Sequence, residues 1–224
     1  MHIIHITNNC NRGGSNHVIL PISSELIKKN IKFTFVYLKK PDILKEELEK
    51  NGIKTKFLGL NPIKILFYLY KIIKNEDKNK IIFHTHLVHG SLLGRFAGKL
   101  FGIPVVTTRH YEERSKDNIL YKFEDFTTKY SNHTIAISES VKFHLVNNLS
   151  VNKKKCTRIY NPIINIFKNY EKVESSSEYI ITFVGRLNPI KGVRYLIESF
   201  KKISLFIPNA KLIIIGADNG CKKK

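Results

Sequence analysis

Two cations bracket a short turn in FVGRLNPIKGVRYLIESF, residues 183–200. Arg186 follows a predicted strand, and Lys191 precedes Gly192 at the start of a predicted helix. An arginine binds phosphate through two parallel hydrogen bonds, and a lysine at a helix N-terminus adds charge where the helix dipole already favours an anion. The spacing therefore predicts a diphosphate site, with two solvated surface cations as the alternative interpretation.

Three histidines lie close together in HTHLVHG, residues 84–90, at the end of another predicted strand. His84, His86 and His89 have the spacing of a metallohydrolase zinc site, but Val88 stands where that site requires an aspartate. We favour a polar strand end that lines a cleft, because ligands of open α/β sheets bind at the carboxyl ends of the strands. We therefore expect no metal and keep the metallohydrolase as an alternative.

Two further turns carry candidate residues. In TTRHYEER, residues 107–114, His110 could act on a substrate hydroxyl or hold an anion, and Arg109 could add charge. A solvated surface loop explains this stretch equally well. Near the N-terminus, Gly13 and Gly14 stand between a strand and a helix, where paired glycines let backbone amides approach an anion. A plain tight turn is the alternative, since NRGGSNH matches no nucleotide-binding fingerprint.

These motifs fall on alternating β-branched runs and helical patterns, which indicate a parallel sheet covered by helices. Strands are predicted at 2–7, 32–38, 53–60, 80–86, 103–110 and 133–138, with helices between them. Residues 1–165 are expected to form one complete α/β domain, followed by a polar, aperiodic linker at 166–178. Residues 179–224 suffice for only one βαβ unit, which cannot bury both faces of a sheet. We therefore expect either a partner that covers it or the first part of a second α/β domain.

One predicted helix, residues 63–74, combines aromatic and basic side chains. Ile63, Phe67, Tyr70 and Lys74 lie near one face at helical spacing. An apolar stripe of this kind usually packs on the core, which is the arrangement we predict. The alternative is contact with anionic lipid, with the aromatic rings at the level of the headgroups.

Composition narrows the classes of partner. The 38 Lys and Arg residues against 18 Asp and Glu give a net charge of +20, which favours nucleic acid, anionic lipid or phosphorylated small molecules. No nucleic-acid-binding signature is present, so we expect no specific nucleic-acid partner. Three scattered cysteines, no signal peptide and no spanning segment predict a cytoplasmic protein, or one held peripherally on the cytoplasmic face of a membrane.

Together, the motifs resemble those of the retaining glycosyltransferases of family 4, which have the GT-B fold. The similar stretches are the Gly13–Gly14 turn, the H-x-H…G strand end at 84–90, LGRFA at 93–97, VVTTRH at 105–110 and RIYNPI at 158–163. The strongest similarity is FVGRL…KG…LIESF followed by PNAKLIIIGA at 208–217. The resemblance covers essentially the whole chain, weakly over 40–75 and strongly over 183–216.

In that family, two Rossmann-like domains face each other across a cleft. The resemblance implies an acceptor-side domain at 1–165 and a donor-binding domain that begins at 179. It further implies that Arg186 and Lys191 neutralise the donor diphosphate and that His110 is the catalytic residue beside the sugar. The residues implied to line the cleft on the acceptor side are Gly13, Gly14, His86 and Arg109. No metal or other cofactor is implied, because the two cations take the electrostatic role of a divalent ion.

The chain departs from the family pattern in one important place. The E-x7-E region that holds the nucleotide and the sugar should follow Gly216, and it is absent from these 224 residues. We therefore expect an incomplete donor-binding domain. The implied reaction transfers sugar from a nucleotide-diphosphate sugar to a glycan or lipid-linked acceptor, in surface polysaccharide or lipopolysaccharide synthesis. The alternative is a truncated chain that binds its ligands without turning them over.

Overall fold

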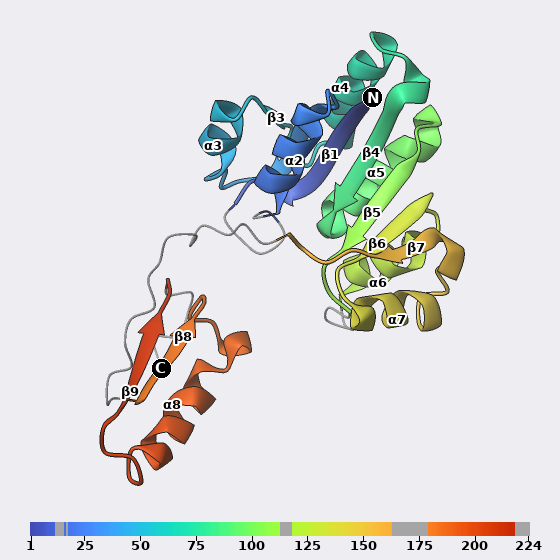
Figure 1. Cartoon of the computed structure of the whole chain (residues 1–224). Helices are drawn as coiled ribbons and strands as arrows, with labels where there is room; N and C mark the ends of the chain where they lie inside the picture. Colours follow the sequence, from blue (N-terminus) through green and yellow to red (C-terminus); the bar gives the residue numbers. More distant parts are fainter. Residues whose placement is uncertain (12–15, 17, 113–117, 163–178, 218–224) are drawn as a thin grey trace. The chain divides into compact units, whose positions relative to one another are not determined.

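The computed structural model describes residues 1–11, 16, 18–112, 118–162 and 179–217. Contacts divide the chain into two compact units, residues 1–165 and 166–224. Each unit has its own parallel sheet (Figure 1). The linker predicted at 166–178 lies outside the described residues.

The first unit contains a seven-stranded parallel sheet with the order β3-β2-β1-β4-β5-β6-β7. Its strands are β1 (His2–Asn9), β2 (Lys32–Lys39), β3 (Lys54–Phe57), β4 (Ile81–His86), β5 (Val105–Arg109), β6 (His133–Ala136) and β7 (Cys156–Arg158). The order of connection reverses between β1 and β4, and such a switch point is where open α/β sheets bind ligands. The carboxyl ends of β1 and β4 therefore mark the edge at which a site is expected.

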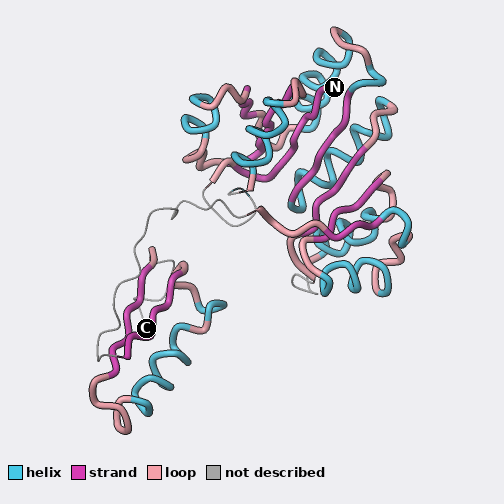
Figure 2. The backbone as a smooth tube through the Cα atoms, viewed as in Figure 1, coloured by secondary structure: helices cyan, strands magenta, loops and turns pink. Residues whose placement is uncertain are grey.

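Helices cover this sheet on both faces (Figures 1 and 2). They are α2 (Ile19–Lys28), α3 (Lys45–Lys50), α4 (Pro62–Lys74), α5 (Leu87–Phe101), α6 (Ile119–Thr128) and α7 (Glu139–Asn147), with short 3-10 turns at Lys78–Lys80 and Lys153–Lys155. Residues of α2 and α3 pack with Phe33, Phe35 and Tyr37 of β2 on one face. Residues of α4 and α5 pack with Ile4 and Ile6 of β1 on the other. This alternation of side chains along each strand makes a three-layer α/β domain.

Helix α5 lies unusually close to the sheet because glycines occupy its inner face. A β-carbon at Gly90 would come 2.6 Å from the carbonyl oxygen of Ile6, and one at Gly94 would come 2.2 Å from Cγ2 of Thr85. The helix ends at Gly102, whose φ of +65° is the left-handed conformation of a C-terminal cap. The close approach fixes the N-terminus of α5 beside the carboxyl ends of β1 and β4.

The prediction for the helix at 63–74 was wrong about which face is buried. Ile63, Phe67, Tyr70 and Lys74 point away from the sheet, whereas Ile65 and Leu69 are fully buried against it. This helix is apolar almost all round, and only one side can contact the strands. The aliphatic side packs there, so the aromatic side is left at the surface.

The elements between residues 40 and 60 are shorter than expected. The helix between the strands predicted at 32–38 and 53–60 covers only Lys45–Lys50, and the second of these strands is limited to four residues, Lys54–Phe57. Both lie in the stretch where the family resemblance is weakest.

The second unit is a single βαβ arrangement. Strand β8 (Tyr179–Val184) pairs in parallel with β9 (Ala210–Ile215), and the 3-10 turn η3 (Pro189–Lys191) and α8 (Val193–Ile203) connect them. Among the described residues of this unit, Val193 alone is buried. One helix and two strands cannot bury both faces of a sheet. The predicted α/β fold, a Rossmann-like unit with a parallel sheet followed by a βαβ unit, is confirmed.

Candidate functional site

The structure brings His86 and His110 together at the carboxyl edge of the first sheet. His86 is the last residue of β4, and His110 directly follows β5, the neighbouring strand. Nδ1 of His86 and Nε2 of His110 lie 2.8 Å apart in a hydrogen bond. One ring must donate and the other accept, so the bond couples the tautomers of the two imidazoles. The pair can therefore hold a proton at a defined atom beside the switch point.

Two more histidines lie behind this pair. The buried ring of His5, from β1, stacks on His86 with centroids 4.1 Å apart and on Phe35 with centroids 5.1 Å apart. His84 meets His5 edge-on, and its Nε2 lies 2.8 Å from Oγ1 of Thr108. Reasoning from the sequence missed His5. His5 lies opposite His84 in the register of β1 and β4, and this neighbour relationship is known only once the two strands are paired.

Burial keeps this cluster uncharged at neutral pH. Burial, followed by the neighbouring histidines, lowers the pKa of His5 and His86 well below the ordinary value. Burial and then the charge of His110 lower the pKa of His84 to about 4. Within the described residues, Nε2 of His5 and Nε2 of His86 have no hydrogen-bond partner.

Neutral imidazoles are good metal ligands, and one nitrogen from each of His5, His84 and His86 lies within 4.8 Å of the others. However, the rings of His5 and His86 are stacked at an interplanar angle of only 30°. The lone pair of an imidazole nitrogen lies in the plane of its ring, so stacked rings cannot aim at one ion. The arrangement therefore fits ring packing better than metal coordination.

His89, the third histidine of the H-x-H-x-x-H pattern, makes a different contact. Its Nδ1 lies 3.1 Å from Nδ2 of Asn8, at the end of β1. Oδ1 of Asn8 accepts hydrogen bonds from the backbone amides of His89 at 3.0 Å and Gly90 at 3.1 Å. The side chain of Asn8 thus satisfies first-turn amides of α5 and ties that helix to β1. No sequence pattern indicated this role.

Arg109 is the last residue of β5, as expected, but its charge is paired inside the first unit. It is buried, and its guanidinium forms ion pairs with Glu124 and Asp125 of α6. Glu124 also pairs with the buried Arg95 of α5 at 2.9 Å. Arg109 therefore joins β5 to α6, and its charge is neutralised by carboxylates instead of being presented to a ligand.

Gly13 and Gly14 lie outside the described residues. Asn16, two residues further along the chain, is anchored: its Nδ2 donates to the backbone carbonyls of Asn9 at 3.1 Å and Asn11 at 2.9 Å. These bonds fix the end of β1 next to Asn8.

In the second unit, Arg186 and Lys191 are both exposed on the turn between β8 and α8. Backbone contacts hold this turn. The amide of Gly185 donates to the carbonyl of Ile215 at 2.9 Å, and that of Leu187 donates to the carbonyl of Ala217 at 2.9 Å. Among the described residues, neither cation forms a side-chain ion pair. Their charges are therefore available to an anion.

Two successive parallel α/β units of this kind are typical of the GT-B fold. The structure is similar to that of the Anabaena protein Alr3699/HepE, which was solved in complex with UDP and glucose. The superposition has a TM-score of 0.77 and 14% sequence identity, and it covers 99% of this chain and 62% of the other. Residues 12–164 match the family described as Glycosyltransferase Family 4, and residues 166–224 match Glycosyl transferases group 1. The chain belongs to glycosyltransferase family 4.

Two curated relatives show the same similarity. The UDP-Gal:alpha-D-GlcNAc-diphosphoundecaprenol alpha-1,3-galactosyltransferase of Escherichia coli is 32% identical over 176 residues, covering 70% of this chain and 45% of the relative. An uncharacterized glycosyltransferase of Methanocaldococcus jannaschii is 28% identical over 211 residues, covering 81% of this chain and 51% of the relative. The chain thus spans about half the length of the curated relatives that it matches.

Proposed function

We propose that this chain acts in sugar transfer from a nucleotide-diphosphate sugar to a glycan or lipid-linked acceptor. The observation that carries the proposal is the exposed pair Arg186 and Lys191 on a turn held by backbone hydrogen bonds. The galactosyltransferase relative supports the substrate classes, because its name specifies a UDP-sugar donor and a diphosphoundecaprenol-linked acceptor.

In the proposed mechanism, Arg186 and Lys191 hold the diphosphate and neutralise its charge as the bond between the sugar and the phosphate breaks. Their charges act most strongly in the transition state, when negative charge develops on the leaving phosphate oxygen. The acceptor hydroxyl attacks the anomeric carbon with retention of configuration. Its proton passes to an oxygen of the leaving diphosphate.

His110 is proposed to orient the sugar or the acceptor hydroxyl through a hydrogen bond. His86 fixes the ring of His110 by the bond of 2.8 Å between them. We propose that Gly13, Gly14, His86 and Arg109 belong to the acceptor side. Because the charge of Arg109 is already paired with α6, its proposed role is to hold the end of β5 in place.

No metal or other cofactor is required in this proposal, since the two cations supply the positive charge. Turnover in excess EDTA should therefore equal turnover with added magnesium or manganese. A strict requirement for either ion would contradict this part of the mechanism.

The cellular setting proposed is surface polysaccharide or lipopolysaccharide synthesis at the cytoplasmic face of a membrane. Among the described residues, no helix is long and apolar enough to cross a bilayer. Attachment is therefore proposed to be peripheral, and no specific nucleic-acid partner is proposed.

The binding step can be tested on the chain itself by recording amide NMR spectra during titration with UDP, pyrophosphate and uridine. UDP and pyrophosphate should shift the amides of 185–192, and uridine should not. Shifts spread evenly over the lysine-rich surface would contradict the site. If the diphosphate binds but no nucleotide-sugar is turned over, the chain is the binding-only form, which is the competing proposal.

A further inference from the structure

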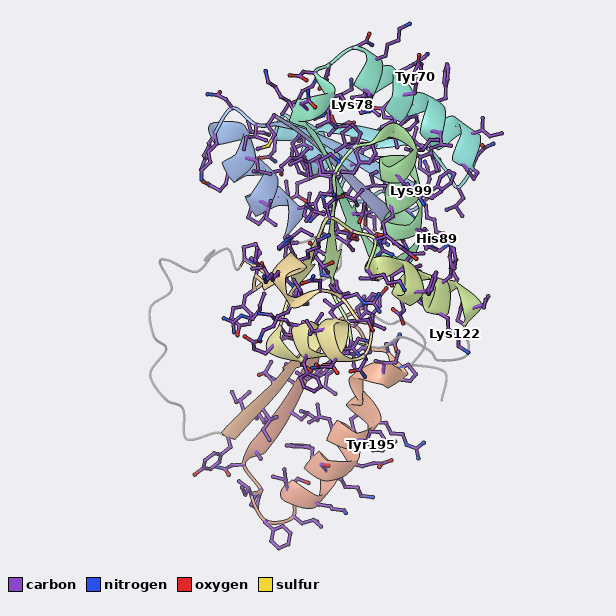
Figure 3. The ribbon with its side chains drawn as sticks, turned by 90° about the vertical axis from the view of Figure 1, so that its right-hand side faces the viewer. Tyr70, Lys78, His89, Lys99, Lys122 and Tyr195 are labelled. Carbon is purple, nitrogen blue, oxygen red and sulfur yellow. The ribbon has the colours of Figure 1, made fainter. Side chains whose placement is uncertain are left out.

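Helices α4, α5 and α6 leave an unusual set of side chains at the surface of the first unit. Six aromatic residues on or just beyond these helices are between 47% and 62% exposed: Phe67, Tyr70, Phe96, Phe123, Phe126 and Tyr130. Isolated exposed apolar residues are ordinary, but a cluster of aromatics marks an interaction surface. Figure 3 shows Tyr70, Lys99 and Lys122 projecting from α4, α5 and α6 in one view.

The charges on these helices have one sign. Their exposed ionisable residues, including the one just after α6, are Lys64, Lys71, Lys74, Lys99, Lys122 and Lys129. Helices α4 and α5 contain no acidic residue, and those of α6 are Glu124 and Asp125, which pair with arginines. We call the twelve aromatic and lysine residues the aromatic–lysine face.

The two kinds of side chain are interleaved. The ammonium of Lys71 lies 4.5 Å from the ring centre of Phe67, and that of Lys129 lies 4.7 Å from the ring centre of Phe126. Between α5 and α6 a groove of about 700 Å³ is lined by Phe96, Phe123 and Phe126 among others. The surface thus offers an apolar hollow and cations within a few ångströms of its rings.

We propose that the aromatic–lysine face is the surface by which this protein binds an anionic lipid bilayer. Lysines can contact lipid phosphates while aromatic rings lie at the headgroup boundary, and the groove can accept acyl chain. A face with no unpaired acid on its helices meets no repulsion from such a membrane. This inference rests on the proposed function, because a lipid-linked acceptor lies in a bilayer and the enzyme must reach it there.

The first test is sedimentation with vesicles of phosphatidylcholine, alone or mixed with phosphatidylglycerol. The variant Lys71→Gln/Lys99→Gln/Lys122→Gln removes three charges from the face. Its matched control, Lys29→Gln/Lys45→Gln/Lys54→Gln, removes three exposed charges: one just after α2, one from α3 and one from β3. Both variants have the same net charge, so diffuse attraction by a strongly basic protein affects them equally.

We expect binding to the anionic vesicles only. Each lysine near the membrane contributes about fivefold in affinity, so the face variant should bind on the order of 100-fold more weakly, and the control within about twofold of the parent. Equal losses in both variants, or no binding by the parent chain, would overturn the proposal. Equally tight binding of single-stranded RNA with the same lysine dependence would also overturn it in favour of a nucleic-acid surface.

A second measurement reports insertion directly. The chain contains no tryptophan. The fluorescence of the Phe126→Trp variant therefore comes from a single tryptophan. Its emission maximum should shift to shorter wavelength on anionic vesicles, and brominated lipid should quench it. The control Ile43→Trp, at an exposed position just before α3, should show neither change. An unshifted Phe126→Trp spectrum in vesicle-bound protein would contradict the assigned face.

Neither measurement depends on sugar transfer. Normal vesicle binding without diphosphate binding would therefore refute the proposed function and support the membrane surface. Diphosphate binding without vesicle binding would support the proposed function and refute the membrane surface.

Discussion

His86 and His110 share a hydrogen bond of 2.8 Å that joins the ends of two adjacent strands, β4 and β5. His86 is buried, and its ring is packed against His5. The orientation of His110 is thus determined from inside the sheet. A residue that acts through another in this way is a positioning residue.

The first prediction concerns this bond. His86→Phe keeps an aromatic ring beside His5 but removes the hydrogen bond to His110. Nitrogen NMR of the imidazoles should show His110 changing from one dominant tautomer to a mixture, while thermal unfolding changes little. In turnover assays, kcat should fall by about 10-fold or more with little change in KM for the donor. If the tautomer of His110 is unaltered, His86 has only a packing role.

The second prediction is a pH dependence of stability. The pKa of His5, His84 and His86 is lowered in the folded chain by burial, so the unfolded chain binds more protons below about pH 6.5. The free energy of unfolding should therefore decrease as the pH falls from about 6.5 toward 4. For His84, whose pKa is about 4, the loss is about 3 kcal/mol.

Replacement of one member tests the cause of that dependence. His5→Phe removes one titrating group and leaves a ring between Phe35 and His86. Urea unfolding at about pH 7 and about pH 5 should show a smaller difference for this variant than for the parent chain. An unchanged difference would show that other groups cause the acid sensitivity.

The third prediction concerns the buried ion pairs. Glu124→Gln removes the carboxylate that pairs with both Arg95 and Arg109, so one buried positive charge is left uncompensated although Asp125 still pairs with Arg109, and the change should cost about 3–5 kcal/mol in the free energy of unfolding. Among the described residues, Asp125 pairs with Arg109 alone, and it is partly exposed, so Asp125→Asn should cost clearly less. Urea unfolding of both variants measures the difference. Equal costs would mean that Glu124 is not the centre of this network.

The fourth prediction concerns the contact between α5 and the sheet. Gly94→Ala places a methyl group only 2.2 Å from Cγ2 of Thr85, and should destabilise the unit by about 1–3 kcal/mol. The nearby Phe96→Ala, at an exposed position on the same helix, should change the free energy of unfolding far less. A Gly94→Ala variant as stable as the parent would show that α5 can move away from the sheet at no cost.

The sequence allowed prediction of the layers because each buried strand is a short β-branched run between helical patterns. It did not reveal the orientation of α4, since that helix has apolar residues on two sides and only the packed sheet selects Ile65 and Leu69. Contacts across strands were also hidden. The stacking of His5 on His86 and the carboxylates around Arg109 join residues that lie far apart in the chain.

The most direct test of the central claim is the calorimetric affinity for UDP of the double variant Arg186→Gln/Lys191→Gln. Its control is Lys201→Gln/Lys202→Gln, which removes two exposed charges from α8 and gives the same net charge. Hydrogen bonds to a charged partner contribute about 1.5–3 kcal/mol each, so the double variant should bind UDP at least about 100-fold more weakly, with the control close to the parent. Equal affinity of the double variant and the control would contradict the assignment of these two cations to a donor diphosphate.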